Sequence, residues 1–467
     1  MDDDITSPLL PKNVDTEDQS HLNISPKLPP LVLKNNPNIR QEGLKLSENS
    51  GSEETIANIF FRPVQHGSLR SSIFCMICVT LGTGMLPIPG LFYSNGLILT
   101  FIIYLFCALP TYYTLQILIS LSHENKIYDF LGLVSKYFGE RSFMTKLSII
   151  VLLINSFGCI ILWNFYINQF SLGLLSYLDP DYATTINESF ICILILILVQ
   201  IPLAIYNKGN EFDIMSTIGV LNIAYVVIVL IAEFPSYFKE FYNSLVLKDI
   251  ETYFTTDINK IMEIPFVLFT AFGNHSTILS VVEQIKHKST DRVLKVGEYT
   301  FFGEFFLYIV LVIVCFMSTF AHTADNDIFL IRPRVTFWMS LGQFFMVILM
   351  ICNISLYYYT TLPTLSFIFN HGKEFTQKEN VFAAVIMLGT LTMISLFLSD
   401  LEDLLTFLGI FAQVSLVFVI PISLYLKIKG NEISQNKRIF FIVAICFYSI
   451  LGIVGFFFMV FNKVENF

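Results

Sequence analysis

The chain has 467 residues, of which 54% are hydrophobic and only 14% are charged. A soluble domain would carry about a quarter charged residues, so this composition excludes a soluble globular protein and indicates one embedded in a lipid bilayer. The net charge of −9 argues against nucleic acid as a partner.

Residues 1–65 are polar, lack a helical period and predict a disordered tail. The membrane domain is expected to span 66–467. Near the start of the tail, Leu9 and Leu10 follow three aspartates, which resembles an acidic dileucine sorting signal with its spacing one residue off. This pattern predicts an endolysosomal or vacuolar membrane, with the plasma membrane as the alternative.

Eleven apolar blocks follow the tail, and their lengths suit helices that cross the hydrocarbon of a membrane. The predicted segments are 69–93, 97–121, 147–175, 189–205, 214–234, 262–283, 296–320, 335–360, 381–399, 402–426 and 439–461. All eight cysteines lie in these blocks, so the sequence predicts no disulfide framework, metal site or cofactor.

The positive charges predict the orientation of the chain. Of the 28 Lys and Arg residues, 22 lie in the tail and in the loops on its side of the membrane. The excess favours a cytosolic N-terminus and a C-terminus on the opposite side. Asn187 begins an Asn-Glu-Ser sequence in a predicted outer loop, which makes it a candidate glycosylation site.

The first segment is predicted to break near its middle, over Gly82–Pro89. Three glycines and two prolines lie between Gly82 and Gly90, and each proline removes a backbone donor and disturbs the helix. A broken membrane helix is tolerated only where its freed backbone groups face protein, water or a ligand. Freed amides suit an anion and freed carbonyls suit a cation, so a small zwitterion is the expected ligand.

The sixth segment has a matching interruption, predicted over Ala271–Asn274, where the polar run Gly273 to Thr277 falls near its middle. Such a polar patch could equally bind neighbouring helices together. Its position favours function, because corresponding interruptions in two halves point to an inverted repeat with a binding site at the membrane midplane. The two breaks are therefore expected to face each other.

Other polar residues at membrane depth leave alternatives open. Glu304 in the seventh segment is a functional candidate by default, although it could also lie in a wet cavity or pair locally. Asn155 in the third segment fits close helix packing or a wall of the substrate site. Trp163 and Trp338 fit an aromatic belt at the membrane surface more simply than a gate.

The residues around the two breaks resemble the amino acid/auxin permease family, which includes vacuolar, sodium-coupled neutral and proton-coupled amino acid transporters. The resemblance lies in the stretch from Thr80 to Leu86 with Pro89 and Gly96, and in the stretch from Phe269 to Ser276. It implies an all-α membrane protein with the five-plus-five inverted-repeat, LeuT-like fold, an eleventh helix and broken helices 1 and 6. It also implies transport of amino acids.

The resemblance further implies roles for individual residues. Amides around Thr83, Gly84 and Met85 match positions expected to hold the substrate carboxylate. The carbonyls near Thr80 and Leu81, and those of Phe269, Thr270 and Ala271, match those expected to hold the ammonium. The full expected substrate site is Thr80, Leu81, Gly82, Thr83, Gly84, Met85, Phe269, Thr270, Ala271, Gly273 and Asn274.

The coupling ion is predicted to be a proton rather than sodium. Many sodium-coupled members of the family have an asparagine where this chain has Cys78, whose thiol is a poor ligand for a hard cation. His275, Glu283 and Glu304 are the candidates for carrying a proton; His275 could equally cap a loose carbonyl. Transport driven by the substrate gradient alone remains an alternative.

Secondary active transport of neutral amino acids by alternating access is the predicted function. The alternative is an amino-acid sensor that signals through the cytosolic tail. An enzyme is disfavoured, because the only histidine deep in an apolar block is His275.

Overall fold

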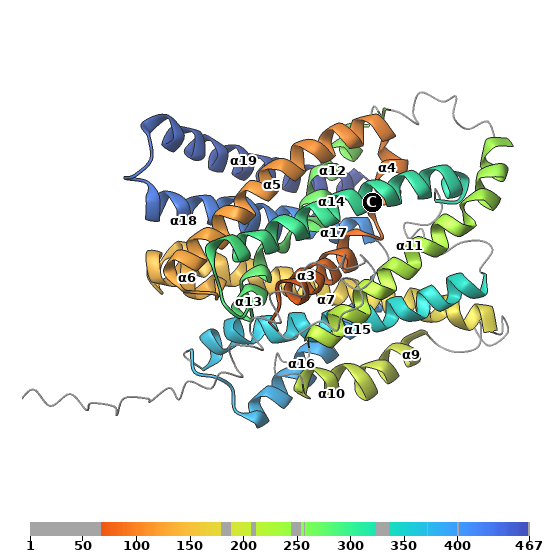
Figure 1. The fold of residues 1–467 in the computed structure, drawn as a ribbon, viewed down its shortest axis with the longest axis horizontal. Coiled ribbons are helices and arrows are strands. Elements are labelled where there is room, and N and C mark those ends of the chain that lie inside the picture. Colours follow the sequence, from red (N-terminus) through yellow and green to blue (C-terminus); the bar gives the residue numbers. More distant parts are fainter. Residues whose placement is uncertain are drawn as a thin grey trace, which may run out of the picture. The chain divides into compact units, whose positions relative to one another are not determined.

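The computed structural model of the chain contains two units, residues 1–62 and residues 63–467. It describes residues 67–178, 188–206, 212–243, 254–255, 257–323, 336–370, 372–398 and 401–465. The predicted disordered tail and Asn187 lie outside the described residues. Every regular element in the described ranges is a helix (Figure 1).

The helices follow the apolar blocks. In chain order they are α3 (Leu69–Gly84), α4 (Ile88–Asn95), α5 (Leu97–Asn125), α6 (Phe130–Phe138), α7 (Phe143–Leu178), α9 (Glu188–Ile195), η2 (Leu196–Gln200), α10 (Ile201–Tyr206), α11 (Phe212–Asn243), α12 (Ile258–Ala271), η5 (Asn274–Ser276), α13 (Ile278–Glu283), α14 (Thr290–Thr323), α15 (Phe337–Phe369), α16 (Gln377–Ser395), α17 (Leu401–Leu408), η6 (Gly409–Val419), α18 (Ile420–Lys429) and α19 (Gln435–Glu465). The elements η2 and η6 are π-helical, and η5 is a 3₁₀ turn.

Nine spans in the described residues are long and apolar enough to cross a membrane. Two shorter apolar helices, Leu69–Thr80 and Phe190–Tyr206, lie in the first and fourth predicted blocks. Together they account for the eleven segments, so the prediction of an all-helical membrane protein is confirmed.

The helix that carries the first break lies in the interior of the membrane unit. Within this unit, α3 packs against α7, α11, α12, α14 and α15 (Figure 1). The last helix, α19, contacts η6, α12 and α18 and leaves Phe447, Ile450 and Phe457 exposed. A helix with large apolar side chains on its outer face suits contact with lipid.

The first break is confirmed but is shorter than predicted. The chain stays helical through Gly84, turns at Met85–Pro87 and becomes helical again at Ile88. Pro89 lies in the first turn of α4, where proline's missing donor costs nothing. Glycine costs a helix only about 1 kcal/mol, so Gly82 and Gly84 do not end α3 earlier. The predicted range Gly82–Pro89 was therefore too wide.

The second break is also present, and it extends further along the chain than predicted. The helix α12 ends at Ala271, a single 3₁₀ turn covers Asn274–Ser276, and α13 resumes at Ile278. The predicted range Ala271–Asn274 was thus too short. The broken helices meet as expected, because α12 contacts both α3 and α4.

Candidate functional site

A fully buried carboxyl group joins the two breaks. Glu304, on α14, has no exposed surface. It accepts hydrogen bonds from the Asn274 side-chain amide at 3.0 Å to each carboxyl oxygen, and it also shares a hydrogen bond with the Thr80 hydroxyl. Asn274 begins the turn in the second break and Thr80 belongs to the helix that ends at the first, so one side chain bridges both.

The Thr80 hydroxyl accommodates two protonation states of Glu304. Its oxygen also lies 2.6 Å from the Met76 carbonyl oxygen, which only accepts hydrogen bonds. If Glu304 is protonated, it donates to Thr80, and Thr80 donates to Met76. If Glu304 is ionised, Thr80 turns its single proton toward the carboxylate. Rotation of one hydroxyl therefore satisfies either state.

No positively charged side chain in the described part of the chain contacts Glu304, whose hydrogen-bond partners are Thr80 and Asn274. Burying a carboxylate without a cation is costly. Closing the protein around Glu304 therefore favours the neutral carboxyl group, whereas access to water allows it to ionise.

Tyr308 lies one turn after Glu304 on the same face of α14, since residues four apart are neighbours on a helix. Its hydroxyl lies 3.2 Å from both the Thr80 and the Ala271 carbonyl oxygens. The end of α3 packs tightly against both Tyr308 and the end of α12. A Cβ atom added at Gly84 would lie 2.3 Å from the Tyr308 hydroxyl oxygen and 2.8 Å from the Ala271 Cβ. Only glycine therefore fits at position 84, where the ends of α3 and α12 come together.

A second polar network supports the later part of the break. Asn155 on α7 donates to the Ser276 hydroxyl at 3.0 Å, and Gln413 in η6 donates to the Asn155 side-chain oxygen at 2.7 Å. A Cβ atom added at Gly273 would lie 2.2 Å from the Gln413 side-chain oxygen. Asn155 thus contacts the break itself, and Gln413 fixes the path of the chain beside it.

Trp163 does not belong to a surface belt, so that prediction was wrong. Its side chain is fully buried and packs edge-on against Tyr357, with ring centroids 4.6 Å apart. A Cβ atom added at Gly82 would lie 3.1 Å from its ring nitrogen. Trp338 is 60% exposed, as a belt residue should be. Hydropathy gives the depth of a residue but not the direction of its side chain.

The three predicted coupling residues are not brought together. His275 is fully buried, and its Nε2 lies 3.1 Å from the Thr114 hydroxyl oxygen. Its Nδ1 has no hydrogen-bond partner in the described part of the chain. Glu283 is exposed at the end of α13. Of the three, Glu304 alone contacts both breaks.

The predicted substrate residues line the two interrupted helix ends. Thr80, Leu81, Gly82, Thr83 and Gly84 form the last turn of α3, and Met85 begins the following turn. Phe269, Thr270 and Ala271 end α12, Gly273 lies in the gap, and Asn274 begins η5. The side chains of Leu81 and Thr83 are not described. Contact of these residues with substrate stays a prediction.

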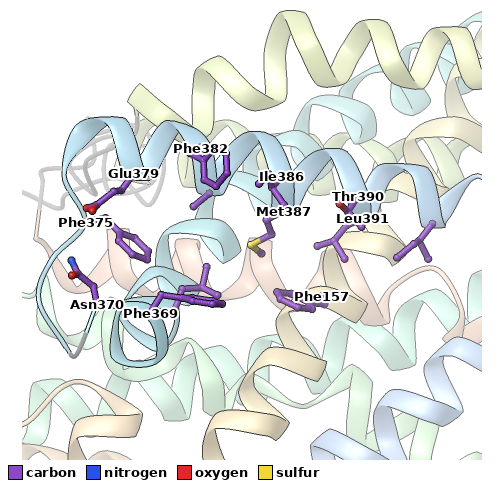
Figure 2. A pocket seen from close by; sticks show the side chains of 13 residues that line it. Phe157, Phe369, Asn370, Phe375, Glu379, Phe382, Ile386, Met387, Thr390 and Leu391 are labelled. Atoms are coloured by element: carbon purple, nitrogen blue, oxygen red, sulfur yellow. The ribbon is translucent and has the colours of Figure 1, made fainter.

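A separate cavity of about 750 Å³ lies between α7, α15 and α16 (Figure 2). Its lining is largely apolar, with Phe157, Phe382 and Met387 among the side chains. Glu379, at one end, already accepts a hydrogen bond from the Thr376 amide at 2.7 Å. None of the residues at the two breaks lines this cavity, so it is not the candidate site.

A helical membrane protein whose two interrupted helices meet in its interior has the architecture of a secondary transporter. A model of the family described as "Transmembrane amino acid transporter protein" matches residues 65–462. The chain belongs to this family, and it is a transmembrane amino acid transporter rather than an enzyme.

Individual relatives are distant. The chain is 22% identical over 404 residues to "Sodium-coupled neutral amino acid symporter 2" of Danio rerio, covering 79% of this chain and 77% of that protein. It is 24% identical over 330 residues to "Putative amino acid transporter AAT1" of Plasmodium berghei, covering 68% of this chain but half (50%) of that protein.

Among solved structures, the chain resembles MhsT in complex with L-phenylalanine. The TM-score is 0.58 at 13% identity, and the match covers 83% of this chain and 98% of the other. At this identity the similarity shows the fold alone. It confirms the inverted-repeat, LeuT-like fold that the family resemblance implies.

Proposed function

We propose that this chain is a proton-coupled secondary transporter of neutral amino acids that works by alternating access, with Glu304 as the proton carrier. The observation that carries the proposal is the contact of Glu304 with both broken helices. A proton at this point changes the hydrogen bonds that link Thr80 to Asn274, so proton binding and closure of the site are coupled.

The charge at the breaks supports a neutral substrate. Among the described residues, Glu304 is the ionisable carboxyl group that hydrogen-bonds within the network of Thr80, Asn274 and Tyr308. With a proton bound, this network offers no net charge to an acidic or basic substrate side chain. The Danio rerio relative is named as a symporter of neutral amino acids, which agrees with this expectation.

The same relative is named as sodium-coupled, but this chain differs at the first helix. Cys78 occupies the place of the asparagine in many sodium users, and the Cys78 carbonyl already accepts a hydrogen bond from the Asn353 side-chain amide at 3.1 Å. There α15 presents a donor to α3, whereas sodium needs oxygen ligands. This contact supports coupling to protons.

Uptake by the purified protein in sealed vesicles tests the proposal. With labelled neutral amino acids and an inward proton gradient at fixed membrane potential, we expect accumulation that is unchanged when choline replaces sodium. A proton ionophore should abolish the accumulation. Uptake that collapses without sodium at constant pH would contradict proton coupling and would show that Cys78 does not prevent sodium from binding.

The same vesicles separate transport from sensing. A sensor would bind amino acids, raising the melting temperature of the protein, without moving label across the membrane. Exchange of internal for external label by the wild-type protein is expected for a transporter. Binding without any such exchange would favour the sensor.

An endolysosomal or vacuolar location is also proposed, because Leu9 and Leu10 follow an acidic cluster. Replacing both leucines by alanine should move a tagged protein to the cell surface. Fluorescence microscopy with a surface-labelling assay measures the change, and alanine replacement of Leu31 and Leu33, in the same tail, is the control. An unchanged distribution of the Leu9/Leu10 variant would remove the support for this location.

A further inference from the structure

The hydroxyl of Tyr308 lies between the two broken helices and shares one proton between two backbone carbonyls. Its oxygen is 3.2 Å from the Thr80 carbonyl oxygen and 3.2 Å from the Ala271 carbonyl oxygen. The side chain is fully buried. These two carbonyls come from different helix ends, and the hydroxyl is the group that joins them.

The Ala271 carbonyl depends on this contact. Ala271 is the last residue of α12, and the final four carbonyls of a helix have no partner within it. The next three backbone amides donate to other carbonyls. The Phe272 amide donates to the Leu268 carbonyl, the Gly273 amide to Thr270 and the Asn274 amide to Phe272. Within the described residues, Tyr308 is therefore the only donor to the Ala271 carbonyl.

The same carbonyls belong to the set expected to receive the ammonium group of the substrate. An ammonium group offers three donors and suits two or more converging carbonyl oxygens. We propose that Tyr308 is a tethered substitute for the substrate ammonium. Its hydroxyl donates to the Thr80 and Ala271 carbonyls when no amino acid is bound, and it releases these carbonyls when the ammonium group of an amino acid binds. This inference rests on the proposed function, because it needs an amino acid to bind at the breaks.

The surroundings of the hydroxyl fit this role. A Cβ atom at Gly84 would lie 2.3 Å from the hydroxyl oxygen, so the hydroxyl also lies against the end of α3. The Tyr308 ring packs on Phe272, with centroids 5.5 Å apart, and Phe272 is the first residue of the second break. Movement of either helix end therefore changes the contacts of Tyr308 directly.

The role has a kinetic consequence. Net transport requires the empty carrier to return across the membrane, and a buried Ala271 carbonyl without a donor would make the closed empty state costly. Tyr308 supplies the donor for that return. Exchange of one amino acid for another never uses the empty return, because substrate is bound in both directions. Tyr308 is thus a positioning residue for one half of the cycle.

The Tyr308→Phe variant tests this division in sealed vesicles. It removes the hydroxyl and keeps the ring. With saturating amino acid on both sides at equal pH, we expect exchange within about twofold of wild type. Net uptake into substrate-free vesicles under an inward proton gradient should fall by about tenfold, the effect of one buried carbonyl left unpaired. The half-saturating concentration for exchange should equal or lie below that of wild type.

Tyr104→Phe is the matched control. Tyr104 is also fully buried, and its ring also packs on Phe272, with centroids 5.3 Å apart. Its hydroxyl, however, donates to the Phe305 carbonyl at 2.8 Å rather than to a carbonyl at the end of either broken helix. We expect this variant to keep the wild-type ratio of net uptake to exchange. Both activities are normalised to folded protein, measured by thermal melting.

Two results would overturn the inference. In one, Tyr308→Phe loses exchange and net uptake in equal proportion, which would assign the hydroxyl to the loaded carrier or to folding. In the other, both activities are unchanged. Failure of the wild-type protein to exchange amino acids at all would instead contradict the proposed function, whatever the variant does.

Discussion

A Glu304→Gln variant will exchange amino acids across a membrane but will not accumulate them when a pH difference is the only driving force. Glutamine keeps the shape of glutamate. Its oxygen accepts from the Asn274 amide and its NH2 group donates to the Thr80 hydroxyl, so one contact to each break survives, while the second of the two Asn274 contacts is lost. It stays neutral and carries no proton. One pH unit is worth about 1.36 kcal/mol, which is about a tenfold accumulation ratio for one proton. We expect that ratio in wild type and a ratio of about one in the variant.

Glu298→Gln is the control for this experiment. Glu298 lies on the same helix, six residues earlier, and is half-buried. Its replacement should leave proton-driven accumulation intact. Accumulation by the Glu304→Gln variant at the wild-type level, with folded protein at equal amounts, would show that the proton travels elsewhere.

A Gly84→Ala variant will lose most of both exchange and net uptake. Its new methyl group would lie 2.3 Å from the Tyr308 hydroxyl and 2.8 Å from the Ala271 Cβ. Ala271 Cβ is fixed by its backbone, so the two helix ends must separate. Overpacking of this kind costs about 1–3 kcal/mol, or roughly 5- to 150-fold in an equilibrium. Labelled amino acid uptake and counterflow in vesicles measure the loss.

Alanine is more favourable than glycine in a helix by about 1 kcal/mol. Helix propensity alone therefore predicts that Gly84→Ala stabilises α3, whereas the close packing predicts a loss. Gly389→Ala provides the comparison, because nothing lies within 4 Å of a Cβ atom added there in α16. That variant should transport like wild type. Wild-type transport by Gly84→Ala would mean that the close approach of the helix ends has no functional role.

The membrane helices could be predicted from the sequence because the thickness of hydrocarbon imposes a length of about 20 apolar residues on each span. The existence of both breaks followed from prolines, glycines and a polar run at membrane depth. The residues at which the two breaks begin and end could not be predicted from the sequence. Gly84 stays within α3, and Pro89 lies in the first turn of α4 rather than ending a helix. Packing between α3, α12 and α14 decides where each helix stops.

The candidate site was only partly visible in the sequence. Glu304 could be singled out because an ionisable group at membrane depth needs an explanation. Tyr308 and Gln413 could not, because one phenol or amide in an apolar block fits many structural roles. The spacing of Glu304 and Tyr308 on one helix face was the available clue to Tyr308. Gln413 contacts Asn155 only because segments distant in the chain come together.

The lone carboxyl group at the helix breaks has an electrical consequence for the proposed cycle. A zwitterionic amino acid with protonated Glu304 crosses the membrane without net charge. Proton coupling requires the empty carrier to return with Glu304 ionised, and thus with one negative charge, although burying that carboxylate is costly. A membrane potential therefore acts on the return, by about 2.3 kcal/mol per 100 mV for a charge that crosses the whole field. The membrane potential would then change the rate at which the empty carrier returns, rather than the rate at which the loaded carrier crosses.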